Sequence, residues 1–283
     1  MKLGMYTEEI VRPTVEELFQ AVRGYGFGEV QFDFVSACGV QIPERIDDAL
    51  VQRIHDAADH NGVVIRAVNG TFNMIHPDKA VRKEGIRRFE QIAQACEPMG
   101  CNLITLCTGS RDPDNMWAFH PDSTTEEAFS DLLDTTEALL KIAGRYNLFL
   151  GVETEPGTST NSPRTSRRLL DHFGSPRLKI IMDCANLFGP GRAYRQYVRE
   201  TIKEAFDYLE KDIILAHGKD IKEGPGVSCT APGRGIVDYD YFLERLRACG
   251  YEGPMILHGI KDEADFPASV AFMKEKVWAG GYR

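Results

Sequence analysis

The sequence predicts an α/β protein with one (β/α)8 barrel domain that spans residues 1–283. Short apolar runs alternate with amphipathic segments along the whole chain, and this alternation indicates parallel βαβ units. The length of 283 residues also suits one such barrel, which typically needs about 250 residues. A doubly wound open sheet is the alternative fold, but no GxGxxG follows the first apolar run.

The apolar runs define eight expected strands. They cover residues 2–7, 29–34, 63–68, 102–107, 148–153, 178–183, 213–217 and 254–258. Four expected helices have a recognisable start: Thr14 with Glu17 three residues later (a capping box), Pro43, Pro77-Asp78 with an end near Met99, and Ser123 or Thr124 with an end near Tyr146. The other expected helices cover residues 162–173, 192–210, 238–249 and 265–278. The longest irregular stretch, residues 222–238, follows the seventh strand, and a loop of that length usually has a function.

Composition and charge exclude some classes of function. The formal net charge of −9 opposes binding along a nucleic-acid backbone, which needs clustered positive charge. No apolar run approaches the roughly 20 residues that cross a membrane, and the N-terminus does not resemble a signal peptide, so a cytoplasmic location is expected. The seven cysteines form no CxxC pair, which favours free thiols in a reducing compartment.

Four polar residues end four successive strands in the C-terminal half. They are Glu153, Asp183, His217 and His258. Side chains that close the strands of a parallel barrel project from one rim, so these four can converge. Two carboxylates and two imidazoles at one point are typical ligands of a divalent metal. The alternatives are a surface carboxylate at Glu153, a turn or cap residue at Asp183 and a packed imidazole at His217.

Other side chains near the same rim could contact a substrate or carry a proton. Glu155 and Lys219 each lie two residues after a strand-end residue and can face the same pocket. The segments after the third and fourth strands contain Asn73, His76, Arg111, Trp117 and His120. An aromatic plate, polar groups and a cation suit a sugar or sugar phosphate, whereas the alternative is a polar loop packed by one tryptophan. No GxSxG, P-loop or HExxH motif is present.

The chain resembles the xylose-isomerase-like TIM-barrel superfamily, which includes sugar phosphate isomerases and epimerases. The resemblance lies in Glu153, Asp183, the His-x-Lys-Asp run from His217 to Asp220, and residues 231–254. It implies a metal-dependent isomerase or epimerase that moves a proton beside the carbonyl of a small sugar or sugar phosphate. Glu153 is then the expected base, with Lys219, Glu155 or His76 as a second proton relay.

One position departs from the family pattern. The superfamily usually has a glutamate after the eighth strand that binds the metal and acts as the second base, and here the residue is His258. A metal-bound imidazole has no free lone pair to carry a proton. The imidazole also makes the ligand set softer, which favours Mn, Zn, Co or Fe over Mg.

Other functions within the superfamily stay open. A metal-dependent lyase or dehydratase of a polyol and a non-catalytic sugar-binding barrel are the alternatives. Endonuclease IV-like activity is opposed by the negative charge and by His55, His60 and His172, which lie in expected helices away from the rim. The expected partner is a small carbohydrate, with no nucleic acid or membrane, and a homo-oligomer is left open.

Overall fold

Eight parallel strands close into a barrel in the computed structural model, which describes residues 1–282. The strand order around the barrel is β1-β10-β7-β6-β5-β4-β3-β2. The strands are β1 (Leu3–Tyr6), β2 (Glu29–Phe32), β3 (Val64–Asn69), β4 (Leu103–Leu106), β5 (Phe149–Glu153), β6 (Leu178–Asp183), β7 (Ile213–Gly218) and β10 (Met255–Leu257). All eight expected strands are therefore present, and the (β/α)8 fold is confirmed.

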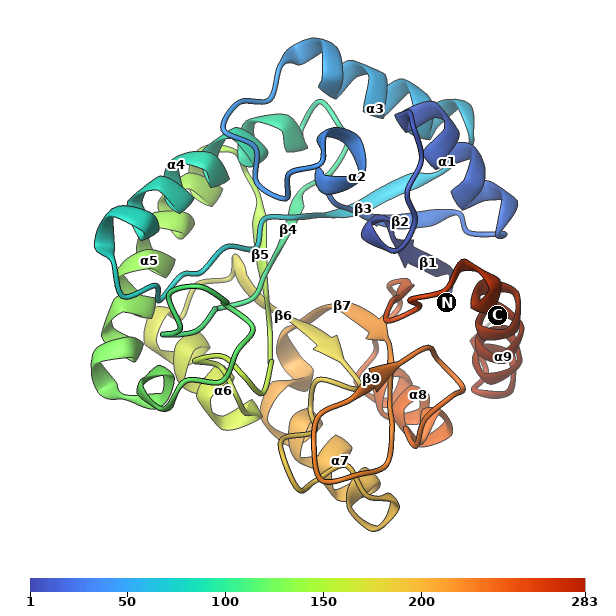
Figure 1. Ribbon diagram of the computed structural model, residues 1–283. Helices are drawn as coiled ribbons and strands as arrows, with labels where there is room; N and C mark the ends of the chain where they lie inside the picture. The colour runs from blue at the N-terminus through green and yellow to red at the C-terminus, as the bar shows by residue number, and fades with distance from the viewer. Residues whose placement is uncertain (283) are drawn as a thin grey trace.

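The helices surround the barrel (Figure 1). They are α1 (Val15–Gly24), α2 (Val35–Cys38), α3 (Asp48–His60), α4 (Lys79–Cys96), α5 (Glu126–Arg145), α6 (Pro163–Phe173), α7 (Val198–Leu209), α8 (Tyr239–Ala248) and α9 (Phe266–Ala279). Side-chain caps explain several of the starts. Thr14 accepts the N–H of Glu17 at 3.2 Å, and Asp78 accepts the N–H of Ala80 at 2.7 Å. No helix within residues 1–282 has both the length and the apolar character needed to cross a membrane.

Three helix starts differ from those expected. The helix expected from Pro43 begins at Asp48, because Asp47 is its cap and accepts the N–H of Leu50 at 2.8 Å. Helix α5, expected to start at Ser123 or Thr124, is capped by Thr125 instead, and residues 121–124 form a 3-10 turn before it. The α7 helix begins at Val198 rather than at 192. The short helix α2 was not expected.

The irregular stretch after β7 contains a two-stranded antiparallel hairpin that the sequence did not indicate. In it, β8 (Asp220–Ile221) pairs with β9 (Cys229–Thr230). The loop that follows folds over the Asp220 side chain. A side chain at Gly235 would place its Cβ 2.3 Å from Asp220 Oδ1, so only glycine allows this close approach.

An apolar layer fills the barrel interior below the rim. It consists of Ala67, Leu103, Ile181, Leu215 and Ile256. Because side chains alternate along a strand, the residue two positions after each of these also points inward, one layer nearer the carboxyl-terminal rim. Those residues are Asn69, Thr105, Asp183, His217 and His258. The alternation of side chains along the strands therefore places three of the four strand-end residues, Asp183, His217 and His258, in one inward-facing layer at the floor of the rim cavity.

Candidate active site

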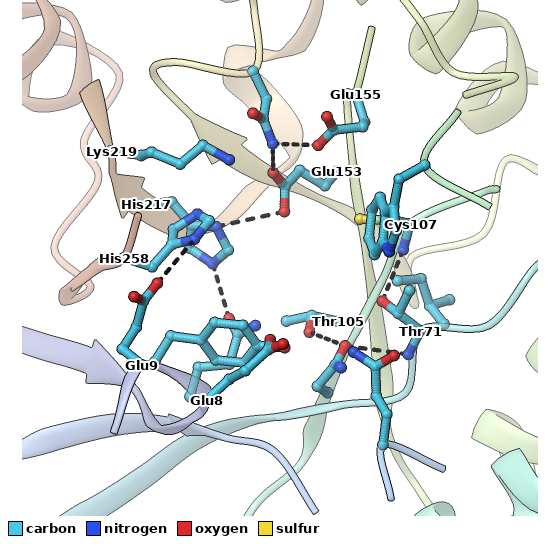
Figure 2. Close-up of a pocket in the computed structure, with 17 residues that line it drawn as sticks. Glu8, Glu9, Thr71, Thr105, Cys107, Glu153, Glu155, His217, Lys219 and His258 are labelled. Carbon is cyan, nitrogen blue, oxygen red and sulfur yellow. Dashed lines mark hydrogen bonds and ion pairs between the residues drawn. The ribbon is translucent and has the colours of Figure 1, made fainter. Parts of the chain in front are cut away.

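A cavity of about 450 Å³ opens at the carboxyl-terminal rim of the barrel. Glu153, His217 and His258 line it, and Asp183 lies buried beside them. The four residues offer ligand atoms that all lie within 4.8 Å of one another. Figure 2 shows Glu153, His217 and His258 pointing toward one another in the cavity. The structure therefore brings together the four residues that the sequence singled out.

Strand register accounts for this convergence. Asp183 at the end of β6 lies opposite His217 on β7. His258 follows β10, and its N–H donates to Gly218 O at 3.1 Å, which continues the ladder by one residue. Glu153 ends β5 opposite Ile181. Each ligand candidate is thus fixed by a barrel strand rather than by a loop.

The His217 ring is oriented for a cation at its Nδ1 atom. Its Nε2 bonds Gln31 Oε1 at 2.8 Å, which makes Nε2 the donor because an amide oxygen can only accept. Its buried Nδ1 has no hydrogen-bond partner within residues 1–282, and it faces Glu153 Oε2 at 3.5 Å and Asp183 Oδ2 at 3.6 Å. Such an outer hydrogen bond is typical of metal-binding histidines.

The electrostatics at His217 also favour positive charge at this point. Burial works against a charged imidazole, but the Asp183 and Glu153 carboxylates outweigh it and raise the pKa of His217 to about 9. A divalent ion can take the place of that proton, because metal ligands must be deprotonated to bind.

His258 offers a neutral imidazole on the other side of Asp183. Its Nε2 lies 2.8 Å from Asp183 Oδ2. Burial, with the nearby Lys219 ammonium, lowers the pKa of His258 to about 4. The neutral ring is the form that binds metals, so two carboxylates and two imidazoles here fit one divalent ion.

Asp183 serves both the turn and the cluster. Its Oδ1 accepts the N–H groups of Ala185 at 2.7 Å and Asn186 at 2.9 Å, while its Oδ2 faces the two histidines. Asn186 Nδ2 in turn donates to both Glu153 Oε1 and Glu155 Oε2. One amide therefore orients the two glutamates, a role that the sequence did not indicate for Asn186.

Glu155 and Lys219 line the same cavity, as expected. Lys219 Nζ lies 3.7 Å from Asp183 Oδ2. Burial opposes a charged Asp183, but the Lys219 ammonium outweighs it and holds the pKa of Asp183 well below its usual range. Burial raises the pKa of Glu155 to about 8, against the effect of Lys219. The site thus holds a cation and a carboxyl group beside the ligand cluster.

The segment after β1 forms a wall of the cavity that the sequence analysis missed. Tyr6, Glu8 and Glu9 line it. Glu9 Oε1 accepts the N–H of Gly259 at 2.6 Å and lies 3.9 Å from His258 Nδ1. Burial raises the pKa of Glu9 to about 7. The available signal was the pair of acids directly after the first strand, the same pattern that identified Glu153.

Neutral polar side chains form the wall opposite the ligand cluster. They are Gln41, Asn69, Thr71 and Thr105. The buried Asp33 fixes part of this wall, because its Oδ2 accepts from Tyr6 Oη at 2.6 Å and from Asn69 Nδ2 at 2.7 Å.

Of the five side chains expected to contact a substrate, only Trp117 lines the cavity. The structure places the other four outside its lining, with polar atoms engaged within the loops. The bonds are Asn73 Nδ2 to Ser110 O at 2.7 Å, His76 Nε2 to Pro113 O at 3.1 Å, Arg111 Nη1 to Asp131 Oδ2 at 2.7 Å, and His120 Nδ1 to the Asp122 N–H at 3.3 Å. These contacts fasten the loops after β3 and β4 to each other and to α5.

Asp131 is the anchor of these loops, so its replacement by alanine is expected to destabilise the protein. Its Oδ1 pairs with Arg82 Nη2 and its Oδ2 with Arg111 Nη1, each at 2.7 Å. The two arginine side chains are only 9% and 8% exposed. Asp131→Ala leaves two buried guanidinium groups without a carboxylate, which should lower the free energy of unfolding by about 3 kcal/mol. Urea unfolding followed by circular dichroism measures this change.

Glu137→Ala is the matched control on the same helix. Glu137 pairs with Lys141 at 2.8 Å, but its side chain is 59% exposed. Its removal should change the free energy of unfolding by less than about 0.5 kcal/mol. Equal effects of the two substitutions would show that Asp131 does not anchor the loops.

Comparison with known proteins places this barrel in a family. Residues 19–276 match the family model described as xylose isomerase-like TIM barrel. The chain is 24% identical over 248 residues to the L-ribulose-5-phosphate 3-epimerase UlaE of Shigella flexneri serotype 5b (strain 8401). The aligned region covers 84% of this chain and 81% of that protein.

Solved structures with low sequence identity share the fold. A D-tagatose 3-epimerase-like protein has a TM-score of 0.77 and 17% identity, over 99% of this chain and 98% of that one. The IOLI protein, solved with a bound zinc atom, has a TM-score of 0.72 and 15% identity, over 99% and 98% of the two chains. The family match covers most of the sequence, and the chain belongs to the xylose isomerase-like TIM barrel family.

Proposed function

We propose that the protein is a metal-dependent isomerase or epimerase that moves a proton beside the carbonyl group of a small sugar or sugar phosphate. The observation that carries the proposal is the convergence of Glu153, Asp183, His217 and His258 at the floor of the rim cavity. The epimerases among the relatives support the reaction class.

The four residues would hold one divalent ion, with Mn, Zn, Co or Fe preferred over Mg because of the two imidazoles. When bound, such an ion polarises a carbonyl oxygen and an adjacent hydroxyl and so acidifies the C–H bond between them. Gln31 and Asn186 keep the ligands in place, because they bond His217 and Glu153 from outside the cluster.

Glu153 is the proposed base. Its two oxygens have different surroundings: Oε1 accepts from Asn186, and Oε2 faces His217 at 3.5 Å. This arrangement fixes the carboxylate at the cavity surface, where it can reach a substrate carbon. Asn186 also ties Glu155 to the same position.

Lys219 and Glu155 are the proposed second proton carriers. Lys219 brings a buried positive charge next to the ligand cluster, where it would stabilise negative charge developing on a substrate oxygen. His76 does not take this role in the proposal, because its ring is bonded to Pro113 O outside the cavity lining.

Solvent deuterium incorporation tests the proposal. The Mn²⁺- or Co²⁺-loaded protein is incubated in D₂O with a panel of ketoses, aldoses and their phosphates, and the products are read by NMR. The expected result is deuterium at the carbon next to the carbonyl, together with an isomer or epimer. Saturable binding of a panel member without exchange would contradict catalysis and leave a sugar-binding barrel.

His258 favours a second candidate, a metal-assisted lyase or dehydratase. Loss of water from a polyol-type substrate needs one base beside the metal, and a metal-bound imidazole in place of the family glutamate removes the second. The same NMR experiment separates the two reactions, because a dehydratase yields an unsaturated or deoxy product.

A further inference from the structure

The loops after the seventh and eighth barrel strands, β7 and β10, carry backbone N–H groups that bind the chain's own carboxylates. In (β/α)8 barrels the loops after these two strands frequently bind a substrate phosphate. An oxyanion needs several free N–H groups or an arginine to replace its water shell. Free N–H groups in these loops would favour a phosphorylated substrate, and occupied ones would favour a substrate without a phosphate.

The loop after β7 is filled by Asp220. Its Oδ2 accepts the N–H groups of Gly233 and Gly235, and its Oδ1 accepts that of Val237, each at 3.0 Å. These three N–H groups from alternate residues converge as in an anion site, but the group they bind is the buried side chain of Asp220.

The turn after β10 is filled in the same way by Glu9. The Gly259 N–H donates to Glu9 Oε1 at 2.6 Å, and Gly259 has a φ of 79°. The Glu9 side chain is only 13% exposed and reaches across from the β1 end of the barrel. A phosphate at this position would have to displace a carboxylate that the fold holds in place.

The cavity also lacks the cations that a phosphate would need. Lys219 is the only lysine or arginine among its lining residues within the described part of the chain, and it already lies 3.7 Å from Asp183 Oδ2. Acidic side chains outnumber this one lysine in the lining. They are Glu8, Glu9, Glu153 and Glu155 in the lining, with Asp183 beside them.

The wall opposite the ligand cluster suits hydroxyl groups instead. Gln41, Asn69 and Thr71 present amides and a hydroxyl that can donate or accept, and Trp117 adds an aromatic face. Glu8, an exposed residue of the cavity lining, provides an acceptor for a further hydroxyl (Figure 2).

We infer that the substrate is an unphosphorylated polyhydroxy carbonyl compound, and that Glu9 is a specificity-determining residue that keeps phosphate esters out. This inference rests on the proposed function and narrows it from sugars and sugar phosphates to neutral sugars. Glu9 selects in two ways: its carboxyl oxygen occupies the Gly259 N–H, and its side chain fills the space beside His258.

The test compares neutral ketoses with their own phosphate esters on the Mn²⁺-loaded protein. The probes are D-tagatose, D-fructose and L-ribulose, each with and without a terminal phosphate. Exchange in D₂O gives kcat/KM, calorimetry gives affinity, and inorganic phosphate is added as a competitor. The neutral sugar should be favoured over its ester by about 100-fold, since the phosphate would lose its water shell in a cavity that offers it too few free donors. Millimolar inorganic phosphate should not compete.

Two variants show whether Glu9 is responsible. Glu9→Ala frees the Gly259 N–H and removes the carboxyl group beside His258, so the preference for the neutral sugar should narrow by about tenfold and inorganic phosphate should begin to compete. Glu9→Gln keeps an acceptor oxygen for the Gly259 N–H, so it should narrow the preference for the neutral sugar less. It is the variant to use if Glu9→Ala does not fold. Glu137→Ala, on the exposed face of α5, should leave the preference unchanged.

The outcomes separate this inference from the proposed function. Turnover or binding that prefers the phosphate esters overturns the inference and leaves the epimerase proposal standing. An unchanged preference in both Glu9 variants overturns the assignment to Glu9. If no member of the panel binds or exchanges, the proposed function and the inference fail together.

Discussion

Replacing Glu153 with glutamine is expected to lower kcat by about 10³-fold while the protein still binds its metal ion. Glutamine keeps the length of the side chain and one oxygen that can accept from Asn186 and contact the ion. It cannot accept a proton from a substrate carbon. The measurements are deuterium exchange at the substrate carbon and metal content of the same sample.

Glu137→Gln is the control for this substitution, because Glu137 lies exposed on α5 and pairs only with Lys141 among the contacts described. It should leave both exchange and metal content unchanged. If Glu153→Gln kept its metal and turned over at the wild-type rate, Glu153 would not be the base, and Glu155 would become the first candidate.

The second large effect is expected at His258. His258→Ala should weaken metal binding on the order of 100-fold, because it removes one of the four proposed ligands and leaves Asp183 Oδ2 without its 2.8 Å partner. His258→Glu should retain the metal and shift the preference towards Mg²⁺ or Mn²⁺, since a carboxylate is a harder ligand than an imidazole. Competition titrations with a chromophoric chelator measure both changes.

His258→Glu also tests the departure from the family pattern. It restores a carboxylate where the superfamily usually has its second base, so it should keep or increase epimerase activity on a ketose. An unchanged metal affinity and activity in His258→Ala would make His258 a packing residue. The site would then have three ligands.

The barrel and the convergence of its four strand-end residues could be predicted because both follow from local sequence periodicity. Each apolar run encodes a strand, and the strand direction decides on which rim its last residue lies. Glu153, Asp183, His217 and His258 needed only that rule. Helix starts were less predictable: Pro43 favours a first helical turn, yet Asp47 caps the helix five residues later than expected.

The rest of the cavity depends on contacts between distant segments. Arg111 was expected to bind an anion of the substrate, and in the structure its guanidinium pairs with the carboxylate of Asp131, 20 positions along the chain. Glu9 lies 250 positions from Gly259, and only barrel closure between β1 and β10 brings them together. Gln31 reaches His217 across 186 positions for the same reason. No short motif encodes such pairs.

The metal content of protein purified without chelator tests the assignment of the ligand cluster most directly. Elemental analysis should find about one divalent ion per chain, and a triple variant with Asp183, His217 and His258 replaced by alanine should contain none. Adding Mn²⁺, Co²⁺ or Zn²⁺ to the stripped wild type should raise Tm, because an ion that binds only the native state stabilises it. A wild-type protein without metal, whose Tm does not respond to any of these ions, would contradict the metal centre and the function built on it.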